Sequence, residues 1–193
     1  MNKIFKASSI PEDIYNNMIG KSIPLEFKDE VDIQKLSYLR ISHWGFDDKE
    51  HIGEMIVDKS ISEEVLAIFM ELFEAKYKIE KIKLIDDYNG DDEKSMSDNN
   101  SSAFCYRKIA NTNKLSDHSL GRAIDINPLY NQYVIGNTAL PKNAFPYVDR
   151  KREDFRYIKK GDFIYNVFIK RGWCWSSKFP DRVDYQHFYK PEN

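Results

Sequence analysis

This chain of 193 residues has few of the features that mark a disulfide-rich, fibrous or membrane protein. Its two cysteines, Cys105 and Cys174, are too few for a disulfide framework or a zinc knuckle, and their spacing leaves open whether they pair. With 8 glycines and 7 prolines, a collagen-like or low-complexity sequence is excluded. No run approaches the roughly 20 apolar residues of a membrane-spanning helix, and the first residues lack the apolar core of a signal peptide.

The chain also lacks a charge of dominant sign. Lys and Arg number 29 against 31 Asp and Glu, which gives a formal net charge of -2. Without a basic field, binding to nucleic acid is not expected. Hydrophobic residues make up 41% and charged residues 31%, as in a globular protein that buries a substantial core. We expect a monomer.

The spacing of apolar residues favours an α+β fold. It predicts a clear helix from Ser62 to about Tyr77, where Ser60 and Glu63 fit a capping box, and a second helix from Asp162 to Lys170. A short helix is expected after Pro11. Because strands and helices do not alternate, a small antiparallel sheet with flanking helices is favoured over a doubly wound sheet. The predicted strands are 36–42, 54–58, 79–85, 103–109, 122–126 and 183–189, and the long irregular segments are 86–100 and 127–156.

The most informative segment reads S-x-H-x-x-G-x-A-x-D and runs from Ser116 to Asp125. His118 and Asp125 are metal-ligand residue types, and Gly121 allows a tight turn between them. A third such residue, His187, lies near the C-terminus. An isolated His and Asp would be read as a turn cap and an ion pair, but the whole pattern favours metal. Since a catalytic zinc site has three protein ligands and an open position for water, we predict one zinc ion bound by His118, Asp125 and His187.

Three further residues are candidates for the chemistry. Asp184, three residues before His187, is close enough to serve as the general base that takes a proton from water and returns it to the leaving amine. Its alternative role is to orient a histidine N–H. Arg107 is expected to hold a substrate carboxylate or the developing oxyanion, unless it is an ordinary exposed strand arginine. Ser116 either donates a hydrogen bond to substrate or caps the turn.

At these residues the chain resembles the zinc D-Ala-D-Ala carboxypeptidases and related endopeptidases of peptidase family M15. The likeness extends from about Leu36 to the C-terminus and includes H-I-G-E-M-I-V from His51 and S-A-F-C-Y-R from Ser102. It leaves residues 1–35 without a counterpart, so we divide the chain into an N-terminal extension (1–35) and a zinc peptidase domain (36–193). One departure is that many relatives carry glutamate where this chain has Asp184.

The resemblance implies the small α+β fold shared with the hedgehog signalling domain, together with the zinc ligands, base and arginine named above. The implied substrate is the stem peptide of peptidoglycan. A D-alanyl-D-alanine carboxypeptidase is the first expectation; an L-Ala-D-Glu cell-wall endopeptidase and a non-catalytic zinc module that binds the cell wall are the alternatives. This substrate implies an extracellular or wall-associated location, although no signal peptide is visible in the chain.

Overall fold

The largest sheet is built by the N-terminal part of the chain. The computed structural model describes residues 3–109, 112–151, 153–176 and 181–192. In it, β2 (Leu36–Trp44) and β3 (Glu50–Asp58) form a long antiparallel hairpin, and β1 (Phe5–Ser8) adds an edge strand to β2. Strand β3 begins four residues before the predicted start. The segment 1–35 therefore contributes a strand to this sheet, and it continues through α1 (Glu12–Met18) and two short 3-10 turns, η1 (Leu25–Phe27) and η2 (Ile33–Lys35).

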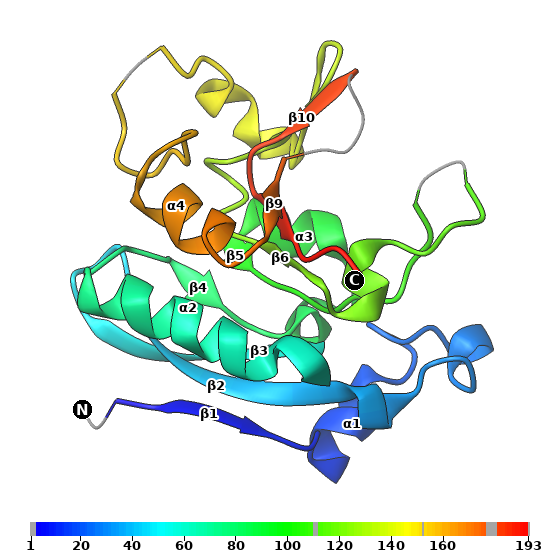
Figure 1. Cartoon of the computed structure of the whole chain (residues 1–193). Coiled ribbons are helices and arrows are strands. Elements are labelled where there is room, and N and C mark those ends of the chain that lie inside the picture. Colours follow the sequence, from blue (N-terminus) through cyan, green and yellow to red (C-terminus); the bar gives the residue numbers. More distant parts are fainter. Residues whose placement is uncertain (1–2, 110–111, 152, 177–180, 193) are drawn as a thin grey trace.

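Helix α2 (Ser62–Glu74) lies along this sheet and closes the main core (Figure 1). Its buried face has the apolar spacing seen in the sequence, with Val65, Ile68, Phe69 and Leu72 almost completely enclosed. The predicted capping box does not form. A 3-10 turn, η3 (Lys59–Ile61), precedes the helix, and Asp58 accepts the Ser60 N–H at 2.7 Å instead.

A second antiparallel sheet, in the order β6-β11-β9, occupies the centre of the molecule. Its strands are β6 (Ala123–Asp125), β11 (His187–Tyr189) and β9 (Cys174–Trp175). Helix α4 (Phe163–Ile169) packs against it, and the rings of Phe168 and Phe188 stack with centroids 4.0 Å apart. Both rings are fully buried, so these short strands are anchored in the main core. Cys105 and Cys174 are free thiols.

The two segments predicted to be irregular contain regular structure. The first holds η4 (Ile85–Tyr88) and α3 (Asp92–Ser97), where Asp91 caps the helix by accepting the Lys94 N–H at 3.1 Å. The second holds a hairpin of two short strands, β7 (Tyr133–Ile135) and β8 (Thr138–Leu140), followed by η6 (Lys142–Tyr147). Strands of three residues carry too little alternation to be read from a sequence.

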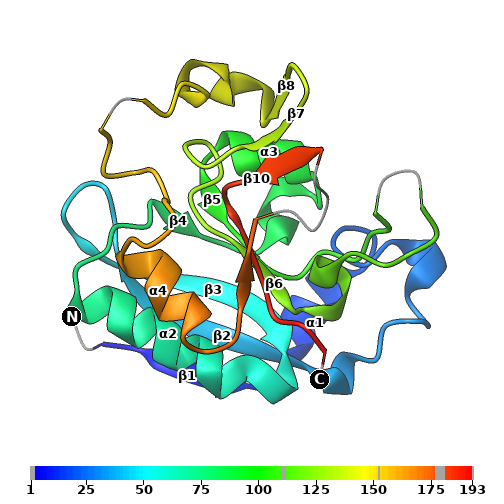
Figure 2. The ribbon, with the colours of Figure 1, turned by 45° about the horizontal axis from the view of Figure 1, so that its top comes forward.

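Two predicted strands are divided or shortened. The predicted strand 183–189 is two strands in different sheets, because β10 (Arg182–Asp184) pairs with β7 in the order β10-β7-β8, whereas β11 joins β6. Figure 2 shows β10 together with this hairpin on the side of β6 that is remote from β1–β3. The predicted strand 79–85 is reduced to β4 (Lys81–Ile82), which pairs in parallel with β5 (Asn100–Ser101).

The segment 103–109 is extended, as expected, but it is no regular strand. An isolated bridge pairs Ser102 with Asp125 just before the segment, and another pairs Lys108 with Leu115 near its end. The expected alternation of its side chains still holds, since Phe104 and Tyr106 lie in the smaller apolar cluster beneath α1. In the part of the chain that the structure describes, no helix has both the length and the apolar composition needed to cross a membrane.

His43 is a titratable group enclosed in β2. Its Nδ1 lies 2.9 Å from the Ile79 carbonyl oxygen, and its ring stacks on the more exposed ring of His51 at 5.5 Å. Burial lowers the pKa of His43 from 6.5 to about 4, against the opposing effect of the hydrogen bond to Ile79. Between these values the folded state binds fewer protons than the unfolded state, so stability falls as the pH drops from 6.5 towards 4.

Replacing His43 with asparagine keeps an N–H donor and removes the titration. Between pH 6.5 and pH 4, we expect the wild type to lose up to about 3 kcal/mol more free energy of unfolding than His43→Asn. Denaturant unfolding at several pH values measures the difference. His51→Asn removes the neighbouring imidazole, which opposes protonation of His43, and should lessen the pH dependence without abolishing it. Equal slopes for wild type and His43→Asn would contradict the assignment.

Candidate functional site

The register of β6 and β11 places two of the predicted ligands opposite each other. Asp125 is the cross-strand partner of His187, and Ile124 is the partner of Phe188. Directly opposed side chains project from the same face of a sheet with their Cβ atoms about 5 Å apart. Because Ile124 and Phe188 are fully buried in the core, the alternation along each strand turns Asp125 and His187 to the other face.

The third predicted ligand, His118, is brought in by a short turn. It lies in η5 (Asp117–Leu120), where Ser116 Oγ accepts the His118 N–H at 3.3 Å. Gly121 ends this turn with a φ of +66°, a conformation that glycine adopts readily. The Nδ1 of His118 lies 2.6 Å from the Ala103 carbonyl oxygen, which fixes its proton there and leaves the Nε2 lone pair for the cluster.

The donor atoms of the three side chains fit one tetrahedral ion. His118 Nε2 lies 3.2 Å from His187 Nδ1 and 3.3 Å from Asp125 Oδ2, and His187 Nδ1 lies 3.0 Å from Asp125 Oδ1. A zinc ion about 2.0–2.1 Å from each donor would space the donors by roughly 3.3 Å in tetrahedral geometry. Among the described residues this is the group of His, Cys, Asp and Glu side chains close enough to share an ion. His118, Asp125 and His187 would therefore hold the metal.

The charges of the cluster suit a cation. Burial opposes ionisation of Asp125, but His118 and His187 hold the pKa of this carboxyl far below its usual range. Burial likewise opposes protonation of His187, whereas its hydrogen bond to Asp125 raises its pKa. The raised pKa of His187 favours its protonated form, which cannot bind a metal ion. A metal ion must replace that proton, so metal affinity decreases as the pH falls.

Asp184 lines the same pocket from the end of β10. Its backbone N–H donates to Ser176 Oγ at 3.1 Å, which fixes the strand end. Its Oδ1 atom is shielded from solvent and has no hydrogen-bond partner among the described residues. Burial raises the pKa of Asp184 to about 6, while the nearby His187 opposes the shift. A carboxyl group with this pKa can both accept and release a proton near neutral pH.

Arg107 also reaches the pocket, but it is already paired. Its Nη2 lies 3.1 Å from Asp92 Oδ2, and both side chains are about one-third exposed. Burial alone would lower the pKa of Arg107, and Asp92 raises it. Ser119 Oγ fixes the local backbone by accepting the Arg107 N–H at 2.8 Å and donating to its carbonyl at 2.6 Å. Arg107 is thus a positioned, permanently charged donor rather than an exposed strand arginine.

Sequence reasoning missed the residues that complete the pocket wall. Asp92 lies in a segment predicted to be a loop, although the run of acids after Gly90 is a typical start of a helix. Tyr133 and Leu140 come from the unpredicted β7–β8 hairpin, and Arg182 comes from β10. Ser116 caps the turn by accepting the His118 N–H, and it also lines the pocket. Its hydrogen bond to substrate stays a prediction.

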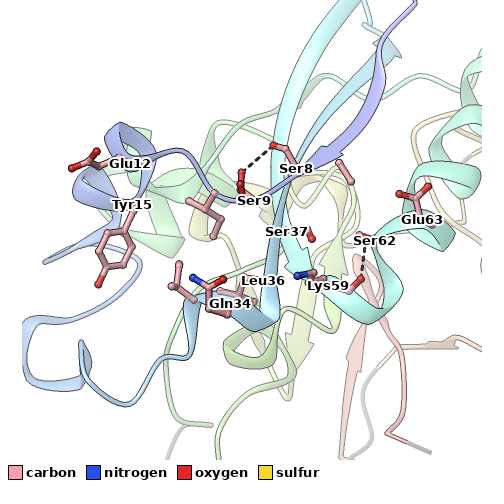
Figure 3. Close-up of a pocket in the computed structure, with 13 residues that line it drawn as sticks. Ser8, Ser9, Glu12, Tyr15, Gln34, Leu36, Ser37, Lys59, Ser62 and Glu63 are labelled. Carbon is pink, nitrogen blue, oxygen red and sulfur yellow. Dashed lines mark hydrogen bonds between the residues drawn. The ribbon is translucent and has the colours of Figure 1, made fainter.

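A second hollow, of about 590 Å³, lies away from this cluster beside β1, α1 and the start of α2 (Figure 3). Two of its hydroxyls are engaged locally, with Ser8 Oγ donating to the Ser9 carbonyl at 3.0 Å and Ser62 Oγ to the Lys59 carbonyl at 2.9 Å. No histidine or cysteine lines it in the described ranges. The pocket of His118, Asp125 and His187, which measures about 570 Å³, is therefore the better candidate for catalysis.

The protein has an α+β fold, and its pocket holds a His-Asp-His cluster whose donor spacing suits one metal ion, with the carboxyl group of Asp184 in the same pocket. Residues 110–190 match the model of a family described as D-alanyl-D-alanine carboxypeptidase, and this match supports the peptidase M15 family. The match supports a peptidase, and M15 peptidases are zinc-dependent in general. The matched segment contains Ser116, His118, Asp125, Asp184 and His187. No curated protein and no solved structure gives a match.

We expect the protein to bind one zinc ion per chain and His118→Ala to lose it, because two donors and an open face hold zinc weakly. Elemental analysis after zinc loading and desalting measures the metal content. His51→Ala, which removes a histidine outside the cluster, is the control and should retain the ion. Retention of a full equivalent of zinc by His118→Ala would show that the ion binds elsewhere.

Gly121→Ala should destabilise the turn that carries His118. A Cβ atom there would lie 2.5 Å from the Asp58 backbone nitrogen and 2.8 Å from the Val57 carbonyl carbon. We expect a loss of about 2–4 kcal/mol in the free energy of unfolding, from the left-handed backbone and the overlap together. Gly136 has a φ of +54°, and a Cβ atom added there would meet no atom within 4 Å. Gly136→Ala therefore measures the backbone contribution alone, which we expect to be about 1 kcal/mol. If Gly121→Ala and Gly136→Ala lost the same free energy of unfolding, the close approach at Gly121 would contribute nothing to stability.

Proposed function

We propose that this protein is a zinc metallopeptidase that hydrolyses peptide bonds in peptidoglycan, with D-alanyl-D-alanine carboxypeptidase activity as the first candidate. The observation that carries the proposal is the meeting of His118, Asp125 and His187 with Asp184 and Arg107 in one pocket. Four of these five residues lie in the segment that matches the carboxypeptidase family.

The residues of the pocket divide the chemistry of peptide hydrolysis among them. Zinc held by the three ligands would supply Lewis-acid polarisation and lower the pKa of water from about 15.7 to roughly 7. Asp184, as a carboxylate, takes a proton from water in the pocket; as a carboxylic acid, it delivers that proton to the departing amine. Arg107 donates hydrogen bonds to a substrate carboxylate or to the developing oxyanion, and its pairing with Asp92 keeps the guanidinium in place.

Two alternatives differ in what the pocket acts on. An L-Ala-D-Glu type endopeptidase would use the same ligands and base on an internal bond of the stem peptide. A non-catalytic zinc module would bind cell-wall peptide without needing Asp184. The buried Oδ1 of Asp184, which has no hydrogen-bond partner within the described part of the chain, favours the catalytic proposal. With any of these substrates, we place the protein outside the cell or at the cell wall and expect it to act as a monomer.

Digestion of purified muropeptides with mass analysis distinguishes these functions. Loss of a single D-Ala indicates the carboxypeptidase, and loss of a larger fragment indicates the endopeptidase. Zinc-loaded protein that leaves all muropeptides intact would refute hydrolysis and leave the binding module. The same samples treated with a chelator are the control, because removal of the ion should abolish any cleavage.

Asp184→Ala should keep zinc but lose activity. We expect kcat to fall by about 10²–10⁴-fold because the proton acceptor is removed, while the metal content stays at the wild-type level. Asp149→Ala, at an exposed aspartate outside the pocket, is the control for removal of one acid. Wild-type turnover by zinc-loaded Asp184→Ala would show that another group moves the proton.

A further inference from the structure

One face of the β10-β7-β8 sheet forms a wall of the pocket. Arg182 and Asp184 are two residues apart on β10 and project from the same face, while Val183 between them is exposed on the other. Tyr133 is the cross-strand partner of Asp184, and Leu140 is the partner of Tyr133. All four same-face residues line the pocket, so the register of this small sheet decides which groups face a substrate.

The guanidinium of Arg182 is oriented within this wall. Its Nη1 donates to the Tyr133 hydroxyl at 3.0 Å, and its Nε and Nη2 each lie 2.8 Å from a carboxylate oxygen of Asp181. The side chain of Asp181 is 57% exposed, whereas that of Arg182 is 25% exposed. An ion pair with so exposed a partner contributes little to stability. Arg182 therefore enters the pocket wall as a positive charge that is held in place by polar contacts.

Building on the proposed function, we propose that Arg182 is a specificity-determining residue that binds a carboxylate of the substrate peptide. Two residues along a strand span about 6.6 Å, and an extended peptide advances about 3.3 Å per residue. Consider a substrate that lies along β10 with its scissile bond beside Asp184. A group of this substrate that is within two residues of the scissile bond then lies beside Arg182. Arginine binds a carboxylate through parallel hydrogen bonds, so the pocket selects a peptide that is anionic at this place.

The carboxylate has two possible sources in one peptide, an acidic side chain and the free C-terminus. Four probes separate them: acetyl-Ala-Glu-D-Ala-D-Ala and its glutamine analogue, each as the free acid and as the C-terminal amide. Calorimetry on zinc-loaded Asp184→Asn protein measures their affinities without turnover. We expect the loss of one of the two carboxylates to weaken binding about tenfold or more, as for a charge-assisted hydrogen bond of about 1.5–3 kcal/mol.

In the same background, Arg182→Gln should abolish that preference, so that the two peptides differing at the selected carboxylate bind equally. Arg40→Gln, at an exposed arginine of β2 outside the pocket, removes the same charge and should leave the preference intact. The inference is overturned if Arg182→Gln keeps the preference, if it weakens all four peptides equally, or if no probe binds.

Cleavage by zinc-loaded wild type is measured separately and tests the proposed function. Arg182-dependent binding without cleavage of peptides or muropeptides would keep the inference and reject the peptidase proposal for these substrates. If the protein cleaved all four probes equally well, whether or not they carry the glutamate or the free C-terminus, the proposed function would stand and the inference would be rejected.

Discussion

The pairing of β6 with β11 is the constraint on which the candidate site depends. It sets Asp125 opposite His187 on one face and Ile124 opposite Phe188 on the other. The apolar pair is fully enclosed, and Phe188 stacks on Phe168 of α4, so a slip of one residue would bury the two polar side chains in the core. The hydrophobic core thus holds the register, and the register assembles the donors. His118 joins them through its bond to the Ala103 carbonyl.

Two carboxyl groups in this pocket acquire opposite character from their surroundings. Asp125 lies between two imidazoles, which keep its pKa very low despite burial. Asp184 is shielded as well, yet its Oδ1 lacks a partner among the described residues, and burial raises its pKa to about 6. One environment favours a permanently ionised carboxylate and the other a group that exchanges a proton. Such a separation of pKa values is what acid–base chemistry at a single site requires.

Elements with long, regular patterns could be predicted from the sequence, and short ones could not. The apolar face of α2 and the alternation of β2 are strong local signals, and both elements are present. The β7–β8 hairpin has three-residue strands whose pairing is decided by β10, about forty residues later in the chain. The capping box at Ser60 failed for a local reason, since Asp58, two residues earlier at the end of β3, already accepts the Ser60 backbone N–H.

The sequence by itself determined the residue types of the candidate metal site, because imidazole and carboxylate at a turn, a strand and a C-terminal strand are recognisable without coordinates. It also indicated Asp184 and Arg107 as partners. Only the tertiary structure decided that Arg107 is held by Asp92, and that Tyr133 and Arg182 share a wall with Asp184. These contacts join segments far apart in the chain, and their geometry depends on sheet register and core packing, which no local pattern encodes.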